Sequence, residues 1–164
     1  MDAPKNPTQW RQKTVIGINL KVMRNKVFNY LTLIVVHLAF TLLVIKYFKE
    51  GNFVNGYTYA GLILMIVSLI FFTIARIQLG DSFQIAAEAR RLVKSGIYKK
   101  IRHPVYLFGS TFIAGFFIFT QVFYGLIFLI IIAVLQTKRI KKEESVLLET
   151  FGDEYLVYKK QTWF

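Results

Sequence analysis

From residue 105 to residue 136 the chain runs for thirty-two residues without a charged side chain. As one helix this run would be about 48 Å long, whereas the hydrocarbon core of a bilayer is about 30 Å thick. Thr120–Gln121, followed by Gly125, is the only plausible break in the run. We therefore predict a tight hairpin of two helices, over 105–119 and 122–136, each just short of a comfortable span.

Two further apolar blocks precede the hairpin, over residues 27–48 and 57–79. Each is long enough to cross a bilayer as a helix. Hydrophobic residues make up 55% of the chain and the mean hydropathy is +0.46, more apolar surface than a soluble domain of this length is able to hide. The predicted fold class is an all-α, polytopic membrane bundle with about four transmembrane helices, the C-terminal hairpin included.

The distribution of the net charge of +12 predicts the topology. Six basic residues precede the first span, two flank the first link, seven lie between Arg76 and Arg102, none lies at the hairpin tip and six follow Gln136. This alternation is the one that the positive-inside rule requires when both termini are cytoplasmic. Residues 1–26 are then a basic cytoplasmic tail, and residues 27–164 form a single membrane domain. Such a charge on an apolar chain favours anionic lipid head groups over nucleic acid.

Shorter helices are predicted between and after the spans. Residues 80–102 have the mixed pattern of an amphipathic helix along the membrane surface, with Asp81 or Ser82 as its cap. After Gln136 a charged cytoplasmic helix continues the last span where it leaves the lipid, and it is expected to end at Phe151–Gly152.

Four single residues receive structural interpretations. His37, in the middle of the first span, is expected to be a neutral histidine bonded to a neighbouring helix rather than a proton relay. Arg76, near the end of the second span, is expected to extend to the membrane interface. Tyr155 and Tyr158 have the character of interfacial anchors.

The segment from Gly96 to Tyr106 concentrates hydrogen-bonding side chains between two apolar blocks. Gly96 is able to take the positive φ that ends a helix, and Pro104 fits the first turn of the next helix. His103 and Tyr106 then stand at a helix start, where free backbone N–H groups favour an anionic ligand.

A second polar group follows the hairpin. Arg139 and Glu143 are four residues apart and share one helix face, with Glu144 beside them. On this segment alone the pattern favours a solvated ion pair. The absence of Cys excludes thiolate metal sites and a Cys nucleophile.

Together the two polar segments resemble the isoprenylcysteine carboxyl methyltransferase family and its wider relatives, the integral-membrane phospholipid methyltransferases. The resemblance covers roughly the last half of the chain. It is carried by Leu79-Gly80 with Phe83, Leu92-Val93, Gly96-Ile-Tyr98, Arg102-His103-Pro104-Val-Tyr106, Arg139 with Glu143-Glu144, and Phe151-Gly152-Asp-Glu154-Tyr155 with Tyr158.

The resemblance implies a site for S-adenosyl-L-methionine built from residues 80–106 and 137–160, and it implies no metal. The residues that the resemblance places around the cofactor fall into two groups. Those on the adenosine side are Leu92, Val93 and Tyr98; those at the methionine end are His103, Pro104 and Tyr106, with Glu143 also touching the cofactor.

The implied reaction is a direct methyl transfer to a lipid or isoprenoid-type acceptor, either a carboxylate such as that of a prenylcysteine or a phospholipid amine. Arg139 would face the acceptor and orient a carboxylate. An amine acceptor needs deprotonation, for which Glu144 or His103 is the candidate base.

Two other classes of function stay open at this point. Membrane sterol reductases share an Arg-His-Pro-x-Tyr turn but use NADPH, and the Glu143–Glu144 pair argues for the methyltransferase side. A small membrane protein without enzymatic activity is the other alternative, but it leaves the two polar segments unexplained.

Overall fold

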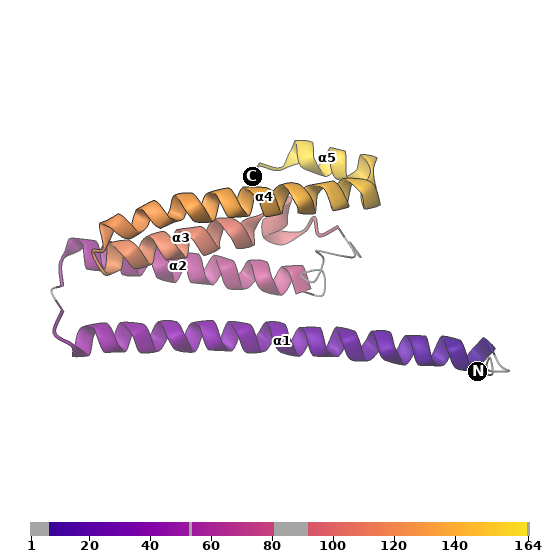
Figure 1. Ribbon diagram of the computed structural model, residues 1–164, viewed down its shortest axis with the longest axis horizontal. Coiled ribbons are helices and arrows are strands. Elements are labelled where there is room, and N and C mark those ends of the chain that lie inside the picture. Colours follow the sequence, from indigo (N-terminus) through magenta and orange to yellow (C-terminus); the bar gives the residue numbers. More distant parts are fainter. Residues whose placement is uncertain (1–6, 53, 81–91, 164) are drawn as a thin grey trace. The chain divides into compact units, whose positions relative to one another are not determined.

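The computed structural model describes residues 7–52, 54–80 and 92–163, with side chains from residue 27 onward (Figure 1). Its helices, in chain order, are α1 (Pro7–Lys49), α2 (Gly56–Leu79), η2 (Gly96–Lys99), α3 (Pro104–Phe119), η3 (Phe123–Gly125), α4 (Leu126–Phe151) and α5 (Asp153–Gln161). No strand occurs in the described ranges, where the single bridge pairs Ile101 with Trp163. The chain divides into two compact units, residues 1–43 and 44–164. The first unit is α1 up to Leu43.

Three helical stretches are long and apolar enough to cross a membrane: Val27–Lys49, Gly56–Leu79 and Phe123–Phe151. A shorter apolar helix, α3, has 16 residues. The predicted helical membrane bundle is thereby confirmed. The predicted boundary at Lys26 is not a helix end, because α1 is continuous from Pro7.

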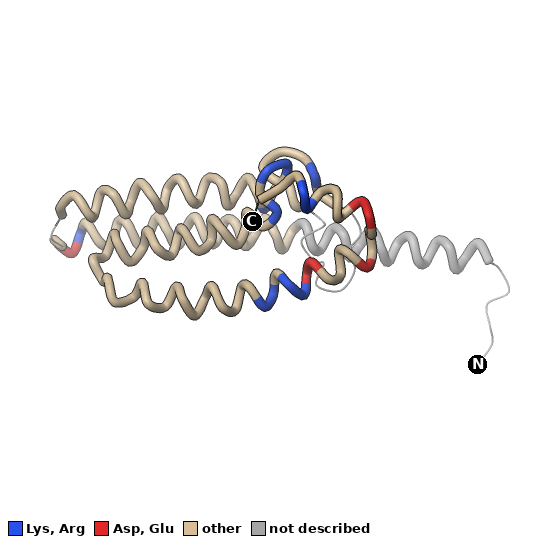
Figure 2. Tube along the Cα trace, turned by 90° about the horizontal axis from the view of Figure 1, so that it is seen from above, with Lys and Arg blue, Asp and Glu red and all other residues tan. Residues whose placement is uncertain are grey.

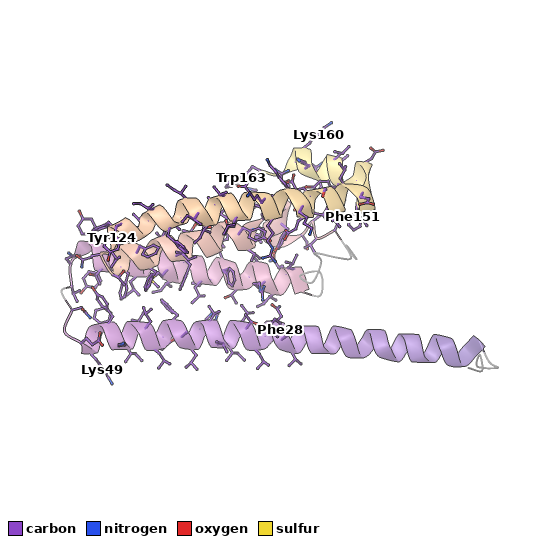
Figure 3. All side chains as sticks on the ribbon, in the orientation of Figure 1. Phe28, Lys49, Tyr124, Phe151, Lys160 and Trp163 are labelled. Atoms are coloured by element: carbon purple, nitrogen blue, oxygen red, sulfur yellow. The ribbon has the colours of Figure 1, made fainter. Side chains whose placement is uncertain are left out.

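The hairpin of α3 and α4 is confirmed, with its turn at the predicted break (Figure 1). Gln121 takes a positive φ of 58° in this turn. Its side-chain oxygen Oε1 accepts a hydrogen bond of 3.0 Å from Nδ2 of Asn55, at the start of α2. Figure 3 labels Tyr124 at this tip and Phe151 at the opposite end of α4. Beyond the predicted span, α4 continues through the charged segment to Phe151, as expected.

Two glycines allow α2 and α3 to approach closely. A Cβ on Gly61 would collide with the backbone of Phe119, and a Cβ on Gly115 would lie 2.9 Å from Met65 Cγ. Met65 and Phe119 are fully buried beside this crossing. This close contact fixes the position of α3 along α2, and therefore also the position of the polar segment that precedes α3.

The C-terminal segment folds back along α4 (Figure 1). Gly152, with a φ of 50°, ends α4 as predicted and starts α5. The expectation that Tyr155 and Tyr158 are interfacial anchors is wrong, because both side chains are buried, at 2% and 5% exposure. Tyr158 donates its hydroxyl to the Tyr98 carbonyl oxygen over 2.8 Å, so α5 is attached to the linker before α3.

The structure also bears on two other single polar residues. Arg76 does not extend to the interface; it is 5% exposed, and its Cζ lies 6.0 Å from the centre of the Phe72 ring. His37 Nδ1 lies 2.7 Å from the Leu33 carbonyl oxygen of its own helix, and the expected bond to a neighbouring helix stays a prediction. The amphipathic helix predicted within residues 80–102, with its cap at Asp81 or Ser82, falls mainly outside the described residues.

Candidate active site

The segment before α3 is shaped by backbone contacts at both ends. Gly96 has a φ of 60° and opens the short helix η2. After it, the Lys100 carbonyl oxygen accepts from Trp163 N over 3.0 Å, which ties the linker to the C-terminal end of the chain. Pro104 then occupies the first turn of α3, as predicted.

His103 is the N-cap of α3, but its side chain makes no capping hydrogen bond. Its carbonyl oxygen accepts from Tyr106 N and Leu107 N, both at 3.1 Å. The backbone therefore completes the helix start, and the imidazole is left to contact another element.

That element is α4, whose two adjacent carboxylates meet the start of α3. Tyr106 donates its hydroxyl to Glu143 Oε1. His103 Nδ1 lies 3.9 Å from Glu143 Oε2, and His103 Nε2 lies 3.5 Å from Glu144 Oε1. The fold thus brings together two segments that are about forty residues apart in the sequence.

Glu144 is also approached by two cations. Arg102 Nη1 lies 3.3 Å from its Oε1, and Lys159 Nζ of α5 lies 2.6 Å from its Oε2. The Glu144 side chain is only 18% exposed. One carboxylate therefore joins α3, α4 and α5 at a single point.

Some buried hydrogen-bond donors around Glu144 have no acceptor in the part of the chain that the structure describes. Arg102 Nε and Nη1 are buried and make no hydrogen bond to any described residue. The Tyr155 hydroxyl is buried too, and its pKa is raised first by this burial and then by Glu144. The contact between Arg102 and Glu144 is close enough for an ion pair but lacks hydrogen-bond geometry. Buried donors without acceptors are costly, so this arrangement suits an anionic ligand that supplies the acceptors.

Burial has the largest effect on the titrating groups of the site. It lowers the pKa of His103 below its ordinary value, although the hydrogen bond to Glu144 and the charge of Glu143 act in the opposite direction. The imidazole is therefore neutral at pH 7, with one donor and one acceptor nitrogen. Burial also raises the pKa of Tyr158 to about 12, which keeps this hydroxyl protonated as a donor.

Arg139 lies one turn before Glu143 on the exposed side of the cluster. Its Nε is 3.5 Å from Glu143 Oε1, and its Cζ is 5.9 Å from the centre of the Tyr106 ring. The side chain is 64% exposed. The guanidinium is thus held at the edge of the cluster, with part of its donor capacity directed outward.

The other predicted site residues lie on the linker. Pro104 is fully buried. Tyr98 is buried as well and donates its hydroxyl to the Ala75 carbonyl oxygen over 3.3 Å, which ties η2 to α2. Leu92 and Val93 are half-buried and are not part of the hydrogen-bond and ion-pair cluster around Glu143 and Glu144.

Three residues of the cluster receive no site role from the sequence: Arg102, Tyr155 and Lys159. Arg102 directly precedes His103, and this adjacency is a usable signal. Lys159 has no such signal, because its contact with Glu144 depends on the reversal of the chain at Gly152. Figure 2 shows that the charged residues of α4 and α5 lie at the end of the hairpin opposite to its tip.

The structure therefore defines a helical membrane protein with a polar, carboxylate-centred site at one end of a helical hairpin. The sequence profile of the phospholipid methyltransferase family matches residues 54–154, and the chain belongs to this family. The match contains both polar segments up to the start of α5.

Two curated relatives agree with this assignment. The chain is 35% identical over 100 residues to a protein-S-isoprenylcysteine O-methyltransferase of Schizosaccharomyces pombe, covering 53% of this chain and 39% of the relative. It is 33% identical over 117 residues to the protein of the same name from Saccharomyces cerevisiae, covering 63% and 46%. The chain spans less than half the length of either relative. No solved structure matches it significantly.

Proposed function

We propose that this chain is an integral-membrane methyltransferase that transfers a methyl group from S-adenosyl-L-methionine to a lipid or isoprenoid-type acceptor. The observation that carries the proposal is the convergence of His103 and Tyr106 on Glu143 and Glu144. These residues lie within the part of the chain that matches the phospholipid methyltransferase family. The names of the two relatives add support, since both are O-methyltransferases.

The residues at the site fit the polar end of this cofactor. Its carboxylate needs donors, which the buried Arg102 nitrogens offer. Its ammonium group needs a carboxylate, which Glu143 offers beside Tyr106. We assign the methionine end to His103, Pro104, Tyr106 and Glu143.

The less polar end is assigned to the linker before α3. Leu92 and Val93 are half-buried there, and Tyr98 holds η2 against α2. These three residues would line the adenosine side.

When bound, the cofactor supplies a methyl group on a positively charged sulfur. The chain's own residues position the partners and exclude water, because a direct displacement needs no covalent enzyme intermediate. Arg139, at the open edge of the cluster, would orient a carboxylate acceptor, which is already a nucleophile at neutral pH. For an amine acceptor, neutral His103 would take the proton, with Glu144 as the alternative base.

Two competing functions predict different ligands. A sterol-reductase-like enzyme would be stabilised by NADPH, and a membrane protein without enzymatic activity by neither nucleotide. A thermal-shift experiment on the purified protein should show stabilisation by S-adenosylhomocysteine and none by NADPH. The reverse pattern would contradict the proposal.

For the topology we propose that both termini face the cytoplasm, so that the charged site lies at the cytoplasmic side. Accessibility tags at Met1 and Phe164 should label from the same side, and a tag at Asn52 from the other. Labelling of the two termini from opposite sides would exclude an even number of spans.

A further inference from the structure

The polar cluster continues from the site into the membrane part of the hairpin. Tyr106 and Ser110 are four residues apart on α3, and Gln136, Arg139 and Glu143 are spaced by three and four on α4, so each set occupies one helix face. Tyr106 bonds Glu143, and Ser110 Oγ donates to Gln136 Oε1 over 3.0 Å. The seam between α3 and α4 is therefore polar from Glu143 to Gln136.

Gln136 marks the deep end of this seam. The preceding residues of α4, 126–135, are all apolar, so Gln136 is the first polar side chain counted from the hairpin tip. It lies seven residues before Glu143, roughly 10 Å deeper along the helix axis. Most of the large apolar side chains of 126–135 are exposed, as expected for a surface in contact with lipid.

The amide of Gln136 is only half satisfied. Its oxygen accepts from Ser110, while its NH₂ group has no hydrogen-bond partner among the described residues. In a hydrocarbon environment such a donor is costly, because no water is there to replace the missing partner. The side chain is half-buried, so a ligand within the seam is able to reach it.

The free groups along the seam are donors, namely the outward N–H groups of Arg139 and the NH₂ of Gln136. We propose that Gln136, oriented by Ser110, binds a carbonyl oxygen that the acceptor carries near the start of its apolar tail. This inference rests on the proposed methyl transfer. It makes Gln136 a specificity-determining residue, and the carbonyl is either an amide next to a prenylated thioether or an ester of a glycerolipid.

A simpler role for the pair is to hold α3 against α4 by an interhelical hydrogen bond. The chain offers a matched control for this role at the opposite end of the hairpin. There the Gln121 amide bonds both Asn55 and Thr58, so it also joins helices but lies away from the site. Gln136→Met and Gln121→Met remove the same amide from two interhelical contacts.

The experiment measures KM, kcat and S-adenosylhomocysteine affinity for the wild type and both variants on paired acceptors. One pair is an N-acetylated S-prenylcysteine and the matching S-prenylthiopropionate, which keeps the carboxylate and the tail but lacks the amide. The other pair is a phosphatidylethanolamine with ester-linked or ether-linked chains. Ser110→Ala is included as a second, milder variant.

Gln136→Met should raise KM about tenfold for the carbonyl-bearing member of one pair and leave its carbonyl-free partner unchanged, because one hydrogen bond to the acceptor is lost. The pair that responds identifies the source of the carbonyl. Ser110→Ala should raise the same KM by a smaller factor, about threefold, because it removes only the bond that orients the amide. Gln121→Met should leave every KM unchanged.

The inference would be overturned if the wild type, Gln136→Met and Ser110→Ala had equal KM values for a carbonyl-bearing acceptor that the enzyme methylates. The proposed function would then remain intact. If Gln136→Met does not fold, the inference is decided by the ratio of the Ser110→Ala and wild-type KM values for the carbonyl-bearing acceptor. Absence of methyl transfer by the wild type to all four acceptors would instead count against the proposed function, and the inference would fail with it.

Discussion

The two ends of the helical hairpin contain polar networks of opposite kinds. At the tip, Asn55 accepts from Tyr57 N and Thr58 N and donates to Gln121, which in turn donates to Thr58. These groups satisfy one another in a closed network without charge.

At the other end the network is charged and incomplete. Glu143 and Glu144 face Arg102, His103, Arg139 and Lys159, yet two buried nitrogens of Arg102 have no hydrogen-bond partner among the described residues. A network whose polar groups are all bonded stabilises a turn. In an incomplete network the buried groups without partners are destabilising until a ligand binds them. The tip of the hairpin therefore has a structural role, and its charged end has the features of a binding site.

The largest effect is expected for removal of a group that completes the charged network. His103→Ala and Glu143→Ala should each weaken binding of S-adenosylmethionine roughly ten- to a hundredfold, since a charge-assisted hydrogen bond contributes about 1.5 to 3 kcal/mol. Calorimetric titration of the folded variants measures this. Unchanged affinity in both would remove His103 from the cofactor site and leave Glu143 as the ion-pair partner of Arg139.

A smaller effect is expected at the open edge of the site. Arg139→Lys keeps the charge but loses the planar, two-pronged donor, so turnover should fall by about tenfold while cofactor affinity is nearly unchanged. Methyl transfer to a confirmed acceptor is the measurement, with calorimetry as the control. If Arg139 only pairs with Glu143, the exposed pair contributes about 0.3 to 0.5 kcal/mol and lysine should replace it without a change in rate.

The closed network at the tip should respond in stability alone. Gln121→Met removes two interhelical hydrogen bonds, and we expect the free energy of unfolding to fall by about 1 to 2 kcal/mol. Binding of S-adenosylhomocysteine should stay as in the wild type. A loss of cofactor affinity in this variant would mean that the two ends are coupled and that the comparison does not hold.

The smallest expected effect is a pH dependence from His103. Its pKa is lowered in the folded protein, so below its ordinary value near 6.5 the unfolded chain binds a proton that the folded protein does not. This contribution to stability is fully present above about pH 6.5 and is lost as the pH falls from there toward the lower folded pKa. His103→Asn should flatten the melting temperature of the ligand-free protein across this range. An identical pH profile for wild type and variant would show that another group is responsible.

Much of the local structure was accessible from the sequence because it depends on neighbouring residues. The uncharged run was too long for one helix, which required the turn that Gln121 makes. Pro104 could begin a helix but not continue one, and Gly152 took the positive φ that ended α4. Composition identified the membrane, and the two polar segments identified the family.

Only the tertiary structure decided which side chains meet. Arg76, Tyr155 and Tyr158 proved to be buried rather than interfacial, and the pairing of Ser110 with Gln136 followed from the rotation of α3 against α4. The physical reason is that helices in a membrane are apolar on nearly every face, so the contrast that reveals the inward side of a soluble helix is missing. Spacing placed Arg139 and Glu143 on one face, but the close approach at Gly61 and Gly115 and the reversal at Gly152 determined what that face contacts.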